Sequence, residues 1–157
     1  IRLSLSPSDP MKTPISALLA QKGTTVYTVR DSATAQDAAN DMVTHNIGCV
    51  LVVDDSRVLG VFTERDLLTH VVALGLDPHT TPIARVMSPL RYTVEPSAPL
   101  EKAMALISEK RVRHLPVLDD GKLVGLISIG DINKWVVERL QYETESLRSY
   151  ISGQYPS

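Results

Sequence analysis

The chain has 157 residues, of which 43 % are hydrophobic, enough for a packed core and too many for general disorder. Its 16 basic and 18 acidic residues give a net charge of −2, and only one Phe and one Trp are present. These numbers exclude the basic field and the aromatic platforms of a nucleic-acid-binding protein.

The first half of the chain predicts alternating short helices and strands. Residues 1–11 are polar and predict a flexible arm. A short helix, a strand, a helix, two strands and a further helix follow, at residues 14–20, 26–29, 34–45, 48–53, 58–63 and 64–74. Thr34 and Asp37 have the spacing of a capping box at the start of the third of these elements. The buried face of that helix is expected to hold Ala35, Ala38, Ala39, Met42 and Val43.

The first half also contains a predicted turn, the lone cysteine and three of the histidines. The turn between its two central strands is predicted over residues 54–57. The lone cysteine, Cys49, stands in an apolar run and is expected to be buried rather than reactive. His45, His70 and His79 share no ligand spacing, so we expect them on the surface and predict no metal site.

The second half repeats the first. A short helix at residues 82–87 matches the one at 14–20, and from there the halves align without a gap at an offset of 65 residues. This internal repeat predicts two equivalent units that share one core. A final helix is expected to run from near Asp131 to about Ile151. One side of this helix carries an apolar stripe, which would pack on the rest of its own domain or on a second copy of the protein. The stripe contains Ile132, Val136, Leu140, Leu147 and Ile151.

One short pattern occurs in both copies: a glycine, two apolar residues, a hydroxyl, two variable residues and an acid. It spans Gly60 to Asp66 and Gly125 to Asp131. The hydroxyl can donate to a phosphate, and the carboxylate can accept from neighbouring ribose hydroxyls. The alternative is that hydroxyl and acid only cap a helix, which we regard as a serious rival for Thr63 and Ser128.

Together with the segment Arg113-His114-Leu115-Pro116-Val117, this repeat resembles a tandem pair of CBS domains, a Bateman module. The resemblance implies a mixed α/β fold: two pseudo-symmetric β-α-β-β-α repeats packed sheet to sheet, with a long C-terminal helix. We expect an arm at residues 1–11, repeats at 12–76 and 77–137, and a helical extension at 138–157.

The resemblance also implies a ligand. CBS pairs bind AMP, ADP, ATP, NAD or S-adenosylmethionine in clefts between the repeats, and commonly form homodimers. By position, Asp66 and Asp131 would hold ribose hydroxyls, and Thr63 and Ser128 would contact a phosphate. Arg113 and His114 would meet phosphate charge, and Arg65 could bind a phosphate bidentately. Ile47 and Val112 would contact adenine. Gly48, which matches Arg113 in the first repeat, carries no charge, so the two sites are expected to be unequal.

The first hypothesis is therefore a non-enzymatic sensor for signal transduction and energy sensing that binds an adenine nucleotide. AMP or NAD is favoured over S-adenosylmethionine because Arg65, Arg113 and His114 supply positive charge near the hydroxyls. The second is an interaction module without a ligand, and a small nucleotide-processing enzyme is a weaker third. The sequence shows no nucleophile elbow and no phosphate-binding loop. No apolar run reaches the ~20 residues of a membrane span and no signal peptide is evident, which favours the cytoplasm.

Overall fold

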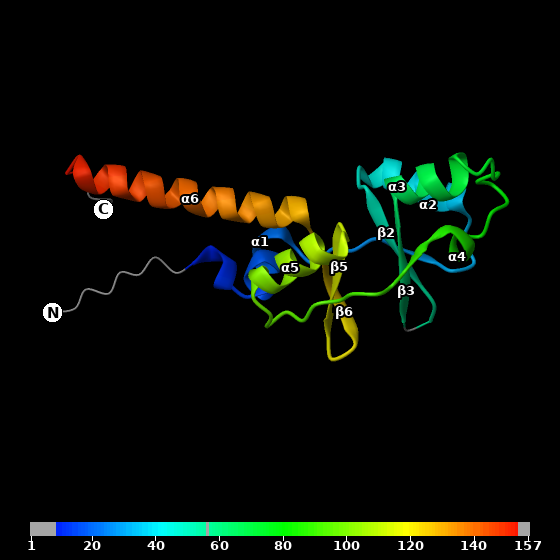
Figure 1. Cartoon of the computed structure of the whole chain (residues 1–157), viewed down its shortest axis with the longest axis horizontal. Coiled ribbons are helices and arrows are strands. Elements are labelled where there is room, and N and C mark those ends of the chain that lie inside the picture. The colour runs from blue at the N-terminus through cyan, green and yellow to red at the C-terminus, as the bar shows by residue number, and fades with distance from the viewer. Residues whose placement is uncertain (1–8, 56, 154–157) are drawn as a thin grey trace. The chain divides into compact units, whose positions relative to one another are not determined.

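A computed structural model describes residues 9–55 and 57–153 and confirms a mixed α/β chain with a long C-terminal helix (Figure 1). The described chain divides into two compact units. One contains residues 25–93, and the other contains the chain up to residue 24 together with the chain from residue 94 onward. Residues 1–8 of the expected arm, Ser56 of the expected turn and residues 154–157 of the expected extension lie outside the described residues.

The unit of residues 25–93 is built on one mixed sheet. Its strand order is β1-β2-β3-β4, with β1 parallel to β2 and the other neighbours antiparallel. The strands are β1 (Thr28–Arg30), β2 (Cys49–Val53), β3 (Val58–Thr63) and β4 (Ser88–Pro89). The helices are α2 (Ala35–His45), α3 (Glu64–Asp66), η2 (Leu67–Val72) and α4 (Ile83–Val86).

The other unit has a smaller sheet and more helix. Strands β5 (His114–Asp119) and β6 (Lys122–Ser128) form an antiparallel pair, and Val94 adds an isolated parallel bridge to Val117. Its helices are η1 (Pro10–Lys12), α1 (Ile15–Lys22), α5 (Leu100–Lys110) and α6 (Ile129–Ile151). The element order of the two repeats is therefore similar, with two differences: the first strand of the second repeat is reduced to a bridge, and β4, which follows α4, has no counterpart after α1.

Each short helix is held by the same pair of backbone hydrogen bonds, which together form an isolated β-bridge. The N–H of Ile15 bonds to the carbonyl of Ala98, and the N–H of Ile83 bonds to that of Ala33. In return, Leu100 donates to Thr13 and Ala35 donates to Thr81, while the bridges Pro14–Pro99 and Thr34–Pro82 complete the pattern. Helix α1 precedes the first repeat in the chain, yet it belongs to the unit that contains the second.

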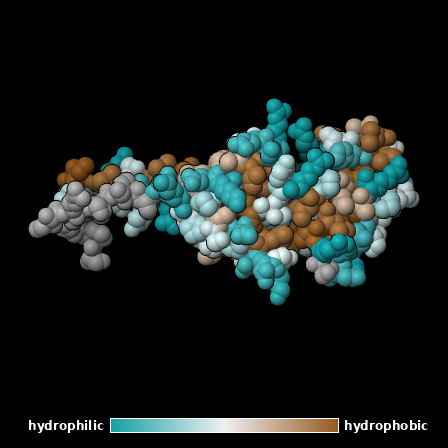
Figure 2. All heavy atoms as spheres, turned by 60° about the horizontal axis from the view of Figure 1, so that its bottom comes forward, coloured by the Kyte–Doolittle hydropathy of each residue, from teal (hydrophilic) through white to brown (hydrophobic). Residues whose placement is uncertain are grey.

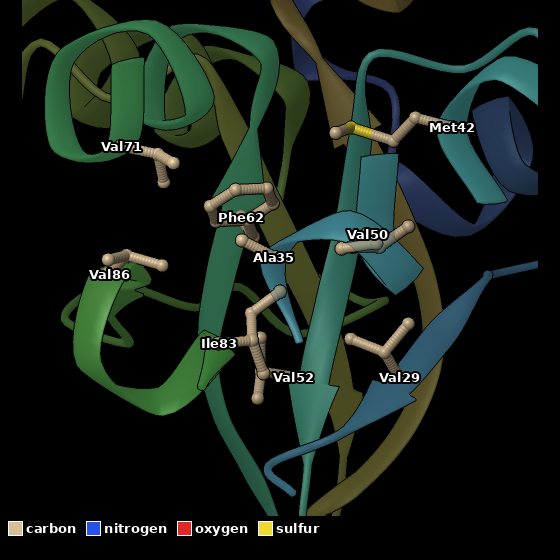
Figure 3. Close-up of a cluster of buried hydrophobic side chains, with 10 residues drawn as sticks. Val29, Ala35, Met42, Val50, Val52, Phe62, Val71, Ile83 and Val86 are labelled. Atoms are coloured by element: carbon tan, nitrogen blue, oxygen red, sulfur yellow. The ribbon is translucent and has the colours of Figure 1, made fainter. Parts of the chain in front are cut away.

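The core of the unit of residues 25–93 lies between β2, β3 and the helices that surround them (Figure 3). Val50, Val52 and Phe62 are fully buried in the sheet, and α4 contributes the fully buried Ile83. Ala35, Ala38 and Met42 of α2 are buried as expected. Val43 is 82 % exposed and Ala39 is half-buried, so the predicted buried face of α2 was too wide.

The helix expected over residues 64–74 begins at Glu64 as predicted, but it does not remain an α-helix. One α turn, α3, passes into the π-helix η2, in which hydrogen bonds span five residues instead of four. The N–H groups of Ala73 and Leu76 continue this pattern, donating to the carbonyls of Leu68 and Val71. The apolar spacing of the sequence does not distinguish this winding from an α-helix.

Helix α6 confirms the predicted length of the final helix and ends at Ile151. Its buried residues, however, are confined to Ile132 and Trp135 in the first two turns. Leu140, Leu147 and Ile151 of the expected stripe are exposed. Within the described chain, every helix is too short or too polar to span a bilayer.

Candidate functional site

The predicted site residues fall into two groups, one in each unit. Thr63 ends β3 and caps α3, which carries Arg65 and Asp66. Ser128 ends β6 and caps α6, which carries Asp131. Each hydroxyl and its acid thus lie where a strand turns into a helix.

The hydroxyl and the acid bind each other in both groups. In the first, the Asp66 N–H donates to Thr63 Oγ1 at 3.2 Å, and the Thr63 N–H donates to Asp66 Oδ2 at 3.0 Å. In the second, the Asp131 N–H donates to Ser128 Oγ at 3.2 Å, and the Ser128 N–H donates to Asp131 Oδ2 at 2.8 Å. These are capping boxes, which satisfy two N–H groups at each helix start.

The environment of Asp66 is closed. The residue is 7 % exposed, and its second oxygen, Oδ1, accepts a hydrogen bond of 2.9 Å from Ser88 Oγ. His70 Nδ1 lies 3.5 Å from the same oxygen and 2.8 Å from the carbonyl oxygen of Val86. Because a carbonyl only accepts, this Nδ1 carries a proton. His70 therefore donates to Val86 and borders Asp66, and its side chain keeps 45 % of its surface exposed, as a surface residue does.

The environment of Asp131 is different, because a charged residue reaches it. Lys22 Nζ lies 2.6 Å from Asp131 Oδ2, and it also donates to the carbonyl oxygen of Leu126 at 2.6 Å. The Asp131 side chain keeps 23 % of its surface exposed. The two equivalent acids are therefore held unequally, one by neutral donors and a histidine, the other by an ammonium group.

The strand residues of the predicted site lie beside these pairs. Ile47 and Gly48 lead into β2, where Cys49 pairs with Thr63, and the Gly48 carbonyl accepts from the Glu64 N–H at 3.1 Å. Val112 and Arg113 lead into β5, where His114 pairs with Ser128. Cys49 is buried as expected, whereas Ile47 packs against the hydrophobic core of its own unit.

Two of the predicted charged residues are open to solvent. Arg65 and Arg113 are both exposed, Arg65 beside the first acid in sequence and Arg113 next to the strand residue that pairs with Ser128. His114 is half-buried at the start of β5. The arrangement thus offers carboxylates for hydroxyl groups and guanidinium groups for anionic ones. Among the described residues, no cluster of His, Cys, Asp or Glu has the composition of a metal site.

A third capping box tests what the hydroxyl–acid spacing means by itself. Thr34 and Asp37 make the same reciprocal bonds at the start of α2, 3.1 and 3.0 Å long. The Thr34 N–H lowers the pKa of Asp37, and the Thr34 hydroxyl adds to this effect. Helix capping therefore accounts for the spacing, and any ligand role has to come from the surroundings of Asp66 and Asp131.

The motif glycines have a packing reason that the sequence did not reveal. A side-chain Cβ at Gly60 would lie 2.5 Å from the backbone oxygen of Ser88, and one at Gly125 would lie 2.7 Å from Leu19 Cδ2. Both distances are too short for real atoms. At Gly60 the obstacle is backbone, so β3 needs glycine there, whereas at Gly125 the Leu19 side chain would have to shift. Lys22 and Ser88 were also missed, because only the fold brings them to the acids. His70 was missed as well, although its i,i+4 spacing from Asp66 is a helical one.

Comparison with protein families finds two matches to the CBS domain, at residues 23–73 and 83–138. The chain belongs to the CBS domain family. A mitochondrial CBS domain-containing protein of Arabidopsis thaliana is 34 % identical over 78 % of this chain and 62 % of its own length. A CBS domain-containing protein of Bacillus subtilis is 37 % identical over 69 % of this chain and 77 % of its own. The chain thus spans less than two thirds of the Arabidopsis relative.

Solved CBS structures share the fold. A CBS-domain protein of Burkholderia ambifaria, assigned to signal transduction, is 41 % identical and superposes with a TM-score of 0.77. The match covers 80 % of this chain and 95 % of that one. These similarities identify the chain as a CBS pair of the kind found in regulatory and signal-transduction proteins.

Proposed function

We propose that this CBS pair is a regulatory, non-enzymatic module that binds an adenosine-containing nucleotide, AMP or NAD in the first place, at its hydroxyl–acid pairs. One observation carries the proposal: in both units a hydroxyl and a carboxylate are fixed at the strand–helix junction of a CBS repeat. Ribose hydroxyls would donate to Asp66 and Asp131, and phosphate oxygens would accept from Thr63 and Ser128.

Charge supports a phosphorylated ligand. Arg65 and Arg113 are exposed, and a guanidinium group binds phosphate through two parallel hydrogen bonds. A solved CBS domain pair of the protein MJ0100, 20 % identical with a TM-score of 0.71, was crystallised with 5′-methylthioadenosine and S-adenosyl-L-methionine. S-Adenosylmethionine, ATP and ADP therefore remain in the set of ligands to be tested here.

The proposal treats the two pairs as unequal sites. A ribose at Asp131 has to share the carboxylate with Lys22, whereas a ribose at Asp66 has to replace the hydrogen bond from Ser88. A charged partner at 2.6 Å competes more strongly than a neutral hydroxyl. We therefore expect the Asp66 site to fill first.

Binding would act on the packing of the units in a homodimer, and an unidentified partner protein would respond to it. A ligand shifts such an equilibrium only by its difference in affinity for the two states. The expected cytoplasmic location belongs to this proposal, and fractionation of cells that express the tagged chain tests it.

Isothermal titration calorimetry of the full chain with AMP, NAD, ATP, ADP and S-adenosylmethionine tests the ligand. The double variant Asp66→Ala/Asp131→Ala should lose at least tenfold in affinity for the ligand that binds, about 1.4 kcal/mol. Asp37→Ala is the matched control, because it removes the third capping box and leaves both proposed sites intact.

The two ways to fail are distinct. Equal loss in the control and the double variant would show that capping, not ligand contact, explains the effect, and unchanged affinity in both would disprove the site. No heat with any ligand would favour a second function, a ligand-free interaction module. The observation behind that alternative is that both acids already have reciprocal capping partners.

A further inference from the structure

Helix α6 extends beyond the part of its unit that holds it. Its buried residues are Ile132 and Trp135, and from Val136 to Ile151 none of its residues is buried. The remaining length is seen in orange and red in Figure 1, and within its own unit α6 contacts α1, α5 and η1. A helix of such length is marginal in water unless an apolar face is covered.

That exposed length has an apolar seam. Val137, Leu140, Thr144, Leu147 and Ile151 follow one another at intervals of three and four residues, and we name these five the tail seam. Its four apolar members are between 51 % and 83 % exposed. Figure 2 shows brown, hydrophobic atoms along this part of the helix. Intervals of three and four place the tail seam on the a and d positions of a coiled coil.

The tail seam is separate from the face that the helix uses in its own unit. At about 100° per residue, the centre of the seam lies roughly 160° around the helix from the buried Trp135. Arg139 covers the Trp135 ring, with its guanidinium carbon 4.3 Å from the ring centre. The seam therefore lies on a different face from Trp135, and each of its apolar members keeps more than half of its surface exposed.

We propose that the tail seam pairs with the same seam of a second copy, the two helices running parallel. With Val137 at position a, Glu143 takes position g and Arg148 position e. In a parallel pair, each g residue faces the e residue five positions on in the other helix, so Glu143 meets Arg148 of the second copy twice by symmetry. In an antiparallel pair e faces e and g faces g, which would oppose Arg148 to Gln141 or to another Arg148.

This inference specifies the surface of the homodimer in the proposed function, but its test needs no nucleotide. Sedimentation equilibrium of the full chain at several concentrations gives the dimer dissociation constant. Leu147→Glu should raise it at least tenfold. Tyr142→Glu is the matched control: Tyr142 is 69 % exposed, similar to Leu147 at 63 %, and it lies away from the seam on the same helix. The control should leave the constant unchanged.

Charge reversal tests the direction of the pair. Glu143→Arg alone should weaken the dimer, and Glu143→Arg/Arg148→Glu should restore it, because the reversed pair is again opposite in sign. A dimer that tolerates Leu147→Glu would overturn the seam while leaving the homodimer proposal intact. A wild-type chain that stays monomeric would overturn both. Failure of the double reversal to restore the dimer would overturn the parallel arrangement.

Discussion

The two motif acids illustrate how one position in a repeat acquires two environments. Asp66 is enclosed by Ser88 and His70, whereas Asp131 is paired with Lys22. Lys22 and Ser88 are distant in sequence, 109 and 22 positions from their acids, whereas His70 is four positions from Asp66. The electrostatic difference between the sites therefore comes from the neighbours and not from the motif.

The Lys22–Asp131 pair should contribute to stability independently of any ligand. A double-mutant cycle with Lys22→Met, Asp131→Asn and the double variant, followed by urea unfolding, should give a coupling of about 1 kcal/mol. The pair is partly shielded, with side chains 36 % and 23 % exposed. Methionine keeps the apolar stem of the lysine, so the cycle reports the charge.

The Arg30–Asp55 pair provides the control, because it has the same distance of 2.6 Å but side chains that are 64 % and 92 % exposed. Its coupling should be smaller, since water screens an exposed pair. Equal coupling in both pairs would mean that shielding does not strengthen the Lys22–Asp131 contact.

At the scale of elements, helix caps and apolar periodicity predict the helices. These predictions were correct where the interactions join residues that are close in sequence. The capping box of Thr34 and Asp37 could be predicted from the sequence because its hydrogen bonds join residues three positions apart. The π-helix η2 was not readable, because the apolar residues of 67–72 fit an α-helix equally well. The exposure of Val43 was missed for a related reason: periodicity indicates a face but not its width.

Capping of α2 by Asp37 should make stability depend on pH. The hydrogen bond from the Thr34 N–H lowers the pKa of Asp37 in the folded chain, so its contribution is complete above the ordinary aspartate pKa of about 4. It is lost as the pH falls through the lowered folded pKa. Asp37→Asn should therefore destabilise the chain at pH 7, and the difference from wild type should shrink towards pH 3.

Urea unfolding of both proteins across this pH range measures the effect. Asparagine does not titrate, so the shrinking difference isolates the carboxylate of Asp37. A difference that stays constant from pH 7 to pH 3 would contradict the lowered pKa and assign the effect to shape alone.

At the scale of the whole chain, sequence order and structural unit do not coincide. The repeat was evident from the offset of 65 residues, and it predicted most strands and helices of the second half from those of the first. It could not show which repeat each short helix joins, because that depends on long-range hydrogen bonds such as Ile15 to Ala98. The expected boundaries at residues 12–76 and 77–137 follow the sequence, whereas the compact units cross them.

Helix α1 belongs to the unit of the second repeat and α4 to the unit of the first, so matched substitutions in the two helices should affect different units. Ile15 of α1 and Ile83 of α4 are both fully buried, so either change to alanine should cost about 2–5 kcal/mol. The local consequences should differ. Ile15→Ala should loosen α5, β5 and the start of α6, whereas Ile83→Ala should loosen α2, β2 and β3, because each isoleucine packs within a different unit.

Hydrogen exchange measured by mass spectrometry can follow both variants peptide by peptide under native conditions, where local opening is visible. In Ile15→Ala, hydrogen exchange should become faster in peptides from residues 100–135 and stay unchanged in peptides from residues 35–63. This result would support the placement of α1 in the unit that contains the second repeat. The reverse pattern, with Ile15→Ala loosening the repeat that follows it in the chain, would return α1 to the first repeat. Equal acceleration everywhere would mean that the two units open together, so that the chain unfolds as one cooperative body.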